Sequence, residues 1–374
     1  MRIGINGQIL FIDEIEKTGP VTYLTNLLIG ISKIDNKSSF IVYLSNRINK
    51  KNFANFKSKF PQNFEFKVLP NSISWMQFSL AKELLSSPLD IFFTSTHSIP
   101  FLHNPKLKIV SMIHGLEYKT NRQYINSPIK AFIHPLILSG VLKFSQIIIT
   151  PSQATKDAIL KSFSIDSQKI QVIPEGVSDD FYKRTPREIS DIRTKYKLGD
   201  SKYLFFVSRI QPRKNIPKMI EGFGNAIKEN PSIRDIKLVI AGKNGWMYEE
   251  SLEAPSKFGI SENVIFTGQV PDEDLPILFS GAHAFISCSL EEGFGLPLLE
   301  SLACETPAMV SDIPAFREIG EDKIIYINPN DVKSIKHGFL EIISHPLTKN
   351  LDSLARKYTW EKTAEKTLKL LIKQ

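Results

Sequence analysis

Short apolar runs alternate with longer amphipathic stretches along this chain, and the alternation occurs twice. Strand–helix alternation of this kind favours a parallel sheet with helices on both faces. In the first half we predict strands at residues 2–6, 40–44, 64–68, 90–94, 109–113, 146–150 and 169–173, and helices at 22–33, 75–85, 128–142 and 152–162.

A polar stretch at 174–199, which contains several Pro and Gly residues, interrupts the alternation and predicts a linker with one helix. The alternation then restarts, and 374 residues are enough for two domains. We therefore predict two Rossmann-like, doubly wound α/β domains at 1–175 and 176–358. The predicted strands of the second domain are 203–208, 237–241, 264–267, 284–288 and 308–311, and its predicted helices are 216–230, 248–258, 272–280 and 296–304.

Open parallel sheets bind their ligands at the carboxyl ends of the strands. Two such domains placed face to face enclose a cleft that is lined by both sets of loops. The candidate functional residues are therefore those that directly follow predicted strands.

The composition excludes several classes of protein. With 42% hydrophobic and 23% charged residues, the chain has the composition of a soluble globular protein. Its most apolar stretch, 129–150, contains two Lys, a His and a Pro, so no segment approaches the roughly 20 apolar residues of a membrane span. The N-terminus runs directly into a strand pattern without a secretory signal, and Cys288 and Cys304 cannot form a disulfide framework. These features predict a cytoplasmic protein.

The formal net charge of +8 lies entirely in the first half. Residues 1–175 contain 20 Lys and Arg against 11 Asp and Glu, whereas residues 176–374 contain 27 against 28. A basic half attracts nucleic acid, anionic lipid or an anionic small molecule, or it is simply a soluble surface. Within it, the lysine-rich segment 50–60 places Phe53, Phe56 and Phe60 on one helical face. This segment is either an interfacial lipid-binding helix or a core-facing helix with an exposed Lys face.

The strongest functional signal is Ser-Leu-Glu-Glu-Gly-Phe-Gly-Leu-Pro-Leu-Leu-Glu-Ser at 289–301, which follows a predicted strand and leads into a helix. Glycines let a ligand approach the backbone closely, and the N–H groups at the helix start suit a diphosphate. Glu292 precedes the turn, and Glu300 lies about one turn into the helix. The two carboxylates are therefore placed to hold hydroxyl groups at two ends of one ligand.

This spacing resembles the E-x7-E signature of family 4 glycosyltransferases, which have the two-domain GT-B fold. The similarity covers most of the chain and is strongest at 172–331. It implies a retaining enzyme whose second domain binds a nucleotide sugar, whose first domain binds the acceptor, and whose last helix, within 359–374, packs back on the first domain. It also implies that Glu292 orients the transferred sugar and that Glu300 binds the ribose. The turn expected to contact the donor comprises Gly293, Phe294, Gly295 and Leu296.

A second signal, Ser-Arg-Ile-Gln-Pro-Arg-Lys-Asn at 208–215, also lies between a predicted strand and a predicted helix. Arg209 and Lys214 are spaced to reach one anion, the first as a planar fork and the second as a point charge. The alternative is an exposed basic loop. The match to the family's diphosphate-binding pair favours the first interpretation and gives no role to Arg213.

Weaker matches lie at three further strand ends. Gly19 is the single glycine in a loop where the family has a glycine-rich segment near the donor phosphate or the acceptor, although a simple loop-to-helix junction explains it equally well. Gly268 follows the predicted strand 264–267, and its residue type agrees with the family pattern after this strand. His114 follows the strand 109–113, where the family commonly has His-Asp and the His approaches the transferred sugar. Here Gly115 replaces the Asp, and Glu117 is a candidate substitute for its carboxylate.

Two positions depart from the family pattern in other ways. Glu175 stands where the family commonly has Asn, and Glu305 where it usually has Gly.

The resemblance predicts a hexosyltransferase of polysaccharide or glycoconjugate synthesis, with a glycan or lipid-linked acceptor and no cofactor. The donor is expected to be a GDP- or UDP-sugar, with GDP-mannose favoured by the Pro-Arg-Lys-Asn loop. Peripheral contact with the anionic inner membrane surface fits such acceptors. Asp272 and Asp274 resemble a metal-binding D-x-D motif, but they lie at the start of a predicted helix. We expect them to cap the free N–H groups of this helix rather than to bind a metal.

Other classes of function remain as alternatives. A catalytically silent sugar-nucleotide-binding subunit is compatible with Gly115 in place of Asp. A Rossmann-type oxidoreductase is disfavoured because no G-x-G-x-x-G follows the first strand. The basic charge comes with no recognised nucleic-acid-binding motif, so we expect no nucleic-acid partner.

Overall fold

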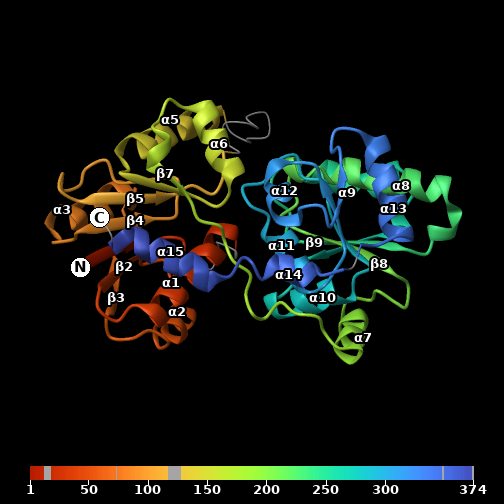
Figure 1. Ribbon diagram of the computed structural model, residues 1–374, viewed down its shortest axis with the longest axis horizontal. Helices are drawn as coiled ribbons and strands as arrows, with labels where there is room; N and C mark the ends of the chain where they lie inside the picture. Colours follow the sequence, from red (N-terminus) through yellow and green to blue (C-terminus); the bar gives the residue numbers. More distant parts are fainter. Residues whose placement is uncertain (12–17, 73, 117–127, 348, 373–374) are drawn as a thin grey trace. The chain divides into compact units, whose positions relative to one another are not determined.

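The computed structural model describes residues 1–374 except 12–17, 73, 117–127, 348 and 373–374. The chain divides into two compact units, which Figure 1 shows in ribbon form. The first unit consists of Met1–Thr120, Pro128–Gly176 and Trp360–Gln374, and the second contains Val177–Thr359. The last helix therefore belongs to the same unit as the first strand.

A seven-stranded parallel sheet forms the centre of the first unit, in the order β3-β2-β1-β4-β5-β6-β7. Its inner strands are mostly apolar, because both faces of a parallel sheet are covered; Ile3 and Ile5 of β1 are fully buried. The strands are β1 Arg2–Asn6, β2 Ser39–Ser45, β3 Phe64–Leu69, β4 Ile91–Thr94, β5 Lys108–Met112, β6 Ile147–Thr150 and β7 Ile170–Val172.

The last helix, α15 (Trp360–Ile372), packs against α1 (Gly19–Ile34). The contact is close because Gly30 of α1 has no side chain: a Cβ atom there would lie 2.6 Å from the Cβ of Ala364. The hydroxyl of Thr363 also donates to the Pro174 carbonyl at 2.7 Å, which ties α15 to the segment after β7. The other helices of the unit are α2 Lys50–Lys57, the π-helical η1 Met76–Leu80, α3 Ala81–Ser86, α5 Pro128–Phe144 and α6 Gln153–Ser162.

The phenylalanines of segment 50–60 face the core. Phe56 is buried with its ring centroid 4.9 Å from that of Phe11, and the Phe60 ring lies 5.1 Å from that of Phe64. The lysines of the segment are exposed. Of the two interpretations of this segment, the core-facing helix with a solvated Lys face is therefore the one that the structure supports.

A six-stranded parallel sheet forms the centre of the second unit, in the order β10-β9-β8-β11-β12-β13. The strands are β8 Tyr203–Val207, β9 Lys237–Ala241, β10 Val264–Gly268, β11 Ala284–Ser287, β12 Ala308–Ser311 and β13 Ile325–Ile327. The helices are α7 Pro186–Lys195, α8 Ile216–Glu229, α9 Glu249–Lys257, α10 Leu275–Gly281, α11 Leu296–Ala303, α12 Pro314–Gly320, α13 Val332–Ser344 and α14 Leu351–Ala355.

The two doubly wound α/β sheets confirm the predicted fold class. Each sheet reverses its strand order once, between β1 and β4 in the first unit and between β8 and β11 in the second. The sequence patterns read above do not predict α12, β13, α13 and α14. β13 is only three residues long and offers no alternation to read. None of the helices in the described part of the chain is long and apolar enough to cross a bilayer.

Glu305 occupies a backbone position that suits glycine. It follows α11 with a φ of 57°, and the bonds from Glu305 N–H to Leu302 O at 3.0 Å and from Thr306 N–H to Ser301 O at 2.9 Å form a Schellman motif. The left-handed conformation strains any residue with a Cβ atom. The glycine that the family usually has here is thereby explained.

We expect Glu305→Gly to stabilise the protein by about 0.5–1 kcal/mol, because relief of the left-handed strain exceeds the extra entropy of glycine in the unfolded chain. Glu305 is exposed, so the substitution leaves the packing unchanged. Urea unfolding of wild type and variant measures the difference. A destabilised variant would show that the Glu305 side chain makes a contact that matters more than its backbone strain.

Candidate functional site

The carboxyl ends of β8 and β11 lie side by side in the second sheet, at the point where the strand order reverses. In open α/β sheets this switch point is where ligands bind, because the loops after the two strands diverge and leave a crevice. Both strong sequence signals, 208–215 after β8 and 289–301 after β11, are placed there by the fold.

The turn after β11 requires glycine at its last position. Gly295 has a φ of 119°, and a Cβ atom there would lie 2.8 Å from the Phe316 ring. Helix α11 begins directly after it, with Pro297 in its first turn. Phe294 is buried and its ring lies 5.7 Å from that of Tyr358. This member of the predicted donor-binding turn therefore packs in the interior of the unit and anchors the turn there.

Glu292 forms ion pairs with two cations of the loop after β8. Its Oε1 accepts from Lys214 Nζ at 2.5 Å, and its Oε2 accepts from Arg213 Nη1 at 3.0 Å. Arg213 also donates to the Glu291 carbonyl at 3.0 Å, and its own carbonyl accepts from Leu290 N–H at 2.8 Å. The two loops are thus fastened together, and the side chains of Lys214 and Glu292 are only 7% and 13% exposed.

Arg213 is the residue that sequence reasoning missed. Its adjacency to Lys214 in an η4 turn (Pro212–Lys214) directs both side chains at Glu292. A two-cation, one-carboxylate cluster could have been suspected from Arg-Lys in one loop and Glu in the next, but only the strand order shows that these loops are neighbours.

The cluster determines the protonation of Glu292. Burial by itself raises the pKa of the Glu292 carboxyl, but the positive charges of Lys214 and Arg213 outweigh burial and lower this pKa to about 2. Glu292 is therefore an anion throughout the neutral range, and it can act as a hydrogen-bond acceptor but not as a general acid.

This lowered pKa predicts an acid-labile contribution to stability. The folded protein binds the Glu292 proton less tightly than the unfolded chain, so the contribution is complete above about pH 4.5 and disappears as the pH falls towards 2. The unfolding free energy of wild type relative to Glu292→Gln should fall by up to about 3 kcal/mol over that interval. Urea unfolding of both proteins at a series of pH values measures it; a pH-independent difference would contradict the ion pairs.

The remaining predicted donor-site residues lie on the same unit. Arg209 follows β8 and is half-buried; a Cβ atom at Gly245 would lie 3.0 Å from its Cγ atom. Gly268 ends β10 with a φ of 68°, and its carbonyl accepts from Gly242 N–H at 2.7 Å. Glu300 is half-buried on α11, and Gly293 and Leu296 are half-buried in and after the turn.

In the first unit, His114 follows β5 and lies against Glu175, which follows β7. The His114 Nδ1 atom is 2.9 Å from Glu175 Oε1, and the two side chains are 14% and 5% exposed. Burial and the nearby Glu175 carboxylate both raise the pKa of the Tyr23 phenol, whose ring meets the His114 ring edge-on at 5.0 Å. Glu117, the carboxylate suggested as a partner of His114, lies outside the described residues.

Gly19 is exposed at the start of α1, and a Cβ atom there would meet no atom within 4 Å. The structure therefore gives no steric reason for glycine at this position. The expected place of Gly19 near the donor phosphate or the acceptor stays a prediction, beside the simple loop-to-helix junction.

Two sequence profiles of known families match the chain. The family described as "Glycosyl transferases group 1" matches residues 188–359, and the one described as "Glycosyltransferase Family 4" matches residues 21–181. The chain belongs to glycosyltransferase family 4. This confirms the resemblance that the E-x7-E spacing indicates.

Curated relatives of this chain include two O-antigen proteins. The O-antigen chain mannosyltransferase B of Escherichia coli is 28% identical over 61% of this chain and 60% of its own length. The O-antigen chain mannosyltransferase RfbU of Salmonella typhimurium is 30% identical over 64% of this chain and 61% of its own length. The match thus spans about three fifths of each relative.

Solved structures share the fold. HepE of Anabaena, solved in complex with UDP-glucose, has a TM-score of 0.78 at 16% identity, with all of both chains covered. WaaG, a glycosyltransferase involved in lipopolysaccharide biosynthesis, has a TM-score of 0.75 at 14% identity, with 99% of each chain covered. The predicted GT-B fold is confirmed.

Asp274 of the D-x-D-like sequence makes a structural contact, but not the one that the sequence suggests. Asp274 begins α10 without a side-chain capping bond. Its Oδ2 atom instead accepts from Lys195 Nζ at 2.6 Å and from the Tyr196 hydroxyl at 2.5 Å, which fastens η7 (Asp272–Asp274) to α7. The expectation that Asp274 caps the helix is wrong, since the carboxylate finds a stronger cationic partner. Among the described residues, no group of three or more His, Cys, Asp or Glu side chains is arranged to hold a metal ion.

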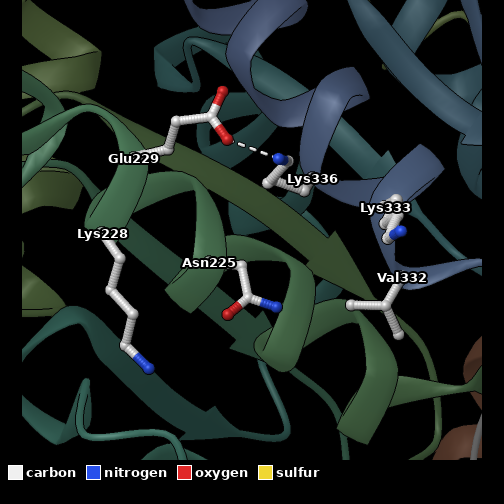
Figure 2. A pocket seen from close by; sticks show the side chains of 6 residues that line it. All are labelled: Asn225, Lys228, Glu229, Val332, Lys333 and Lys336. Atoms are coloured by element: carbon white, nitrogen blue, oxygen red, sulfur yellow. Dashed lines mark hydrogen bonds and ion pairs between the residues drawn. The ribbon is translucent and has the colours of Figure 1, made fainter.

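A separate depression of about 460 Å³ lies between α8 and α13 (Figure 2). It is open, and Lys336 forms an ion pair with Glu229 at its edge. The lining side chains come from two helices rather than from the loops after strands, and they include no predicted site residue. They are Asn225, Lys228, Glu229, Val332, Lys333 and Lys336.

Proposed function

We propose that this chain is a retaining hexosyltransferase that uses a nucleoside-diphosphate sugar as its donor. The observation that carries the proposal is the cluster of Lys214, Arg213 and Glu292 at the switch point of the second sheet. A diphosphate requires cations and helix-terminal N–H groups, and a sugar requires a fixed anionic acceptor for its hydroxyl groups. Both are supplied here by two adjacent loops.

The proposed roles follow from the charges. Glu292 accepts hydrogen bonds from the transferred sugar, while Arg209 and Lys214 neutralise the diphosphate as it leaves. In the absence of donor, Glu292 holds Lys214 and Arg213 in place, so little rearrangement is needed when the anionic donor arrives. Such preorganised charges stabilise the transition state without reorganisation during the reaction. Glu300 is the candidate partner of the ribose.

Retention of configuration is proposed from the family resemblance. We favour a front-face route in which the departing diphosphate assists attack by the acceptor hydroxyl, over a covalent glycosyl-enzyme. The donor glycosidic bond breaks as the acceptor oxygen bonds to the anomeric carbon, and the acceptor proton passes to the leaving diphosphate. Determination of the anomeric configuration of the product tests this directly.

The donor is proposed to be GDP-mannose. Two of the curated relatives are mannosyltransferases of O-antigen chains, which supports mannose and a polysaccharide acceptor, whereas the Anabaena neighbour was solved with UDP-glucose. Thermal-shift measurements with GDP-, UDP-, dTDP- and ADP-sugars distinguish the donors. The largest stabilisation is expected with GDP-mannose, and a larger one with UDP-glucose would overturn the assignment.

A catalytically silent binding subunit is the alternative. It would be stabilised by a nucleotide sugar in the same way, but it would neither transfer the sugar nor hydrolyse the donor slowly. Release of free nucleoside diphosphate from the preferred donor therefore separates the two proposals.

We expect EDTA to leave transfer unchanged. Arg209, Lys214 and the start of α11 supply the positive charge that a divalent cation provides in metal-dependent transferases, and Asp274 is already paired with Lys195. Transfer rates measured after dialysis against EDTA, with and without added Mg²⁺ or Mn²⁺, test this. A strict requirement for a divalent cation would contradict the proposed electrostatics.

The acceptor is proposed to be a glycan or a lipid-linked glycan, reached by peripheral contact with the cytoplasmic face of an anionic membrane. The excess of basic residues in 1–175 supports this contact. Each Lys near an anionic surface contributes about 1 kcal/mol at low salt. The exposed Lys50, Lys51, Lys57 and Lys59 are candidates for this electrostatic part.

A further inference from the structure

The pair formed by His114 and Glu175 replaces two features of the family at once. The Asp that commonly follows the His is Gly115 here, and the Asn that commonly stands at 175 is Glu. Strands β5 and β7 are both neighbours of β6, so the residues that follow them meet at one edge of the sheet. The carboxylate lost beside His114 is thus restored from two strands away, with Glu175 Oε1 at 2.9 Å from His114 Nδ1.

The surroundings hold this pair in place. Glu175 is buried, and its backbone follows Pro174, whose carbonyl accepts from Thr363 of α15. The His114 ring packs edge-on against Tyr23, and Tyr23 packs against Trp360 at a centroid distance of 6.0 Å. The imidazole therefore has little freedom to rotate away from the carboxylate.

The pairing decides which ring nitrogen carries the proton. An ionised carboxylate only accepts hydrogen bonds, so the proton of a neutral His114 ring lies on Nδ1. Nε2 then presents a lone pair. In the described part of the chain Nε2 has no hydrogen-bond partner, although it is shielded from solvent. An unpaired buried polar atom is costly, and a ligand hydroxyl group would satisfy it.

We propose that Glu175 is a positioning residue that fixes His114 as an Nε2 acceptor for a hydroxyl group of the bound sugar. The identity of the ligand rests on the proposed function, whereas the tautomer rests on the geometry alone. Glu175 acts through His114 and does not itself contact the sugar.

Nuclear magnetic resonance measures the tautomer directly. Long-range ¹H–¹⁵N correlation spectra of protein labelled with ¹⁵N-histidine distinguish Nδ1–H from Nε2–H rings, and His114→Asn identifies the signal among the seven histidines. Wild type is expected to show Nδ1–H at position 114. Glu175→Ala should shift the ring towards the Nε2–H form, whereas Glu175→Gln, whose amide oxygen can still accept, should retain Nδ1–H.

Activity provides a second readout. Glu175→Ala is expected to lower kcat/KM for transfer roughly 10–100-fold, by analogy with the loss of a partner that orients a metal-ligating imidazole, and Glu175→Gln should recover much of it. Glu65→Gln, an exposed substitution in the same unit, is the matched control and should change neither readout. An Nε2–H tautomer in wild type would overturn the inference even if Glu175→Ala fails to fold. Absence of transfer with every donor, combined with an Nδ1–H ring, would instead count against the proposed function alone.

An independent observation concerns the outward face of α5. Ile129, Phe132, Ile133 and Leu136, here called the α5 face, are exposed at the spacing i, i+3, i+4, i+7, and Phe132 is 72% exposed. Such a spacing places the four side chains on one stripe of the helix. Contiguous exposed apolar surface of this kind is uncommon on soluble proteins unless something covers it.

The α5 face continues towards a further exposed apolar side chain, and it belongs to a basic stretch of the sequence. A Cβ atom at Gly140 of α5 would lie 3.3 Å from the Phe101 ring, which is itself exposed. Lys106, Lys108 and Lys143 are exposed, and Glu117 is the only acidic residue in the sequence between 101 and 144. An exposed apolar face in a basic stretch of the chain matches an anionic lipid surface, which offers hydrocarbon beneath a layer of negative charge.

We infer that the α5 face inserts into an anionic membrane surface. The phenylalanines of segment 50–60 cannot do so because they pack in the core, which leaves α2 only its charges. The α5 face supplies the apolar contact, and the lysines supply the attraction.

Vesicle co-sedimentation tests this with phosphatidylcholine vesicles that contain or lack phosphatidylglycerol. Wild type should bind only the anionic vesicles, and the double variant Phe132→Ser, Leu136→Ser should lose most of this binding. Leu347→Ser, a similarly exposed apolar position in the second unit, is the control and should bind like wild type. Binding that is unchanged in the α5 variant overturns the inference. So does a dimer of wild type in size-exclusion chromatography that the α5 variant abolishes, because a second copy would then cover this face.

Discussion

Replacement of Glu292 by Gln is expected to reduce sugar transfer by about 10²–10³-fold, the scale of losing one preorganised polar contact in a transition state. The amide retains the shape of the carboxylate but not its charge, so it holds neither the sugar nor Lys214 at 2.5 Å as firmly. Nucleotide affinity should change little, because the diphosphate contacts belong to other groups. Initial transfer rates and calorimetric titration of the nucleoside diphosphate measure the two effects separately.

Two controls make this result interpretable. Glu253→Gln on α9, which is exposed, should behave like wild type. Because the ion pairs of Glu292 also stabilise the fold, the variant must be shown by thermal unfolding to be folded at the assay temperature. Near-normal transfer by folded Glu292→Gln would show that Glu292 only fastens the two loops and does not act on the sugar.

The double variant Arg209→Ala, Lys214→Ala is expected to weaken binding of the nucleoside diphosphate by about 10²-fold or more. Each hydrogen bond to a charged group contributes roughly 1.5–3 kcal/mol, and about 1.4 kcal/mol corresponds to a factor of ten. Lys214 is only 7% exposed, so water cannot replace its charge efficiently. Calorimetric titration with the diphosphate product measures the loss.

Lys228→Ala removes a positive charge from the second unit at the depression between α8 and α13, and it should leave the diphosphate affinity unchanged. The single variant Arg213→Ala distinguishes two possible roles of Arg213, which are to hold Glu292 in place and to bind the diphosphate. If Arg213 serves mainly to hold Glu292, its loss should reduce transfer more than diphosphate affinity. Unchanged affinity in the Arg209, Lys214 double variant would place the diphosphate elsewhere.

Several site features could not be predicted because they depend on which strands are neighbours. Arg213 and Glu292 are 79 residues apart, and His114 and Glu175 are 61 apart. Nothing local in either segment indicates its partner. The switch-point order β8–β11 makes the first pair adjacent, and the order β5-β6-β7 makes the second pair adjacent. Asp274 is a similar case, since its partner Lys195 lies on a helix that packs against α10 only in the folded protein.

Local patterns in the sequence are enough to predict the two parallel sheets, the position of the glycine-rich turn and the family. These follow from local patterns: continuous apolar strands, helical periodicity, and a spacing of Gly, Pro and Glu that few other structures require. The tertiary structure alone decided which charges meet, which face of α2 is core, and why Glu305 is strained. The physical reason is that burial and ion pairing arise between segments that the chain brings together only when the sheets form, whereas backbone preference and periodicity are already present in each segment.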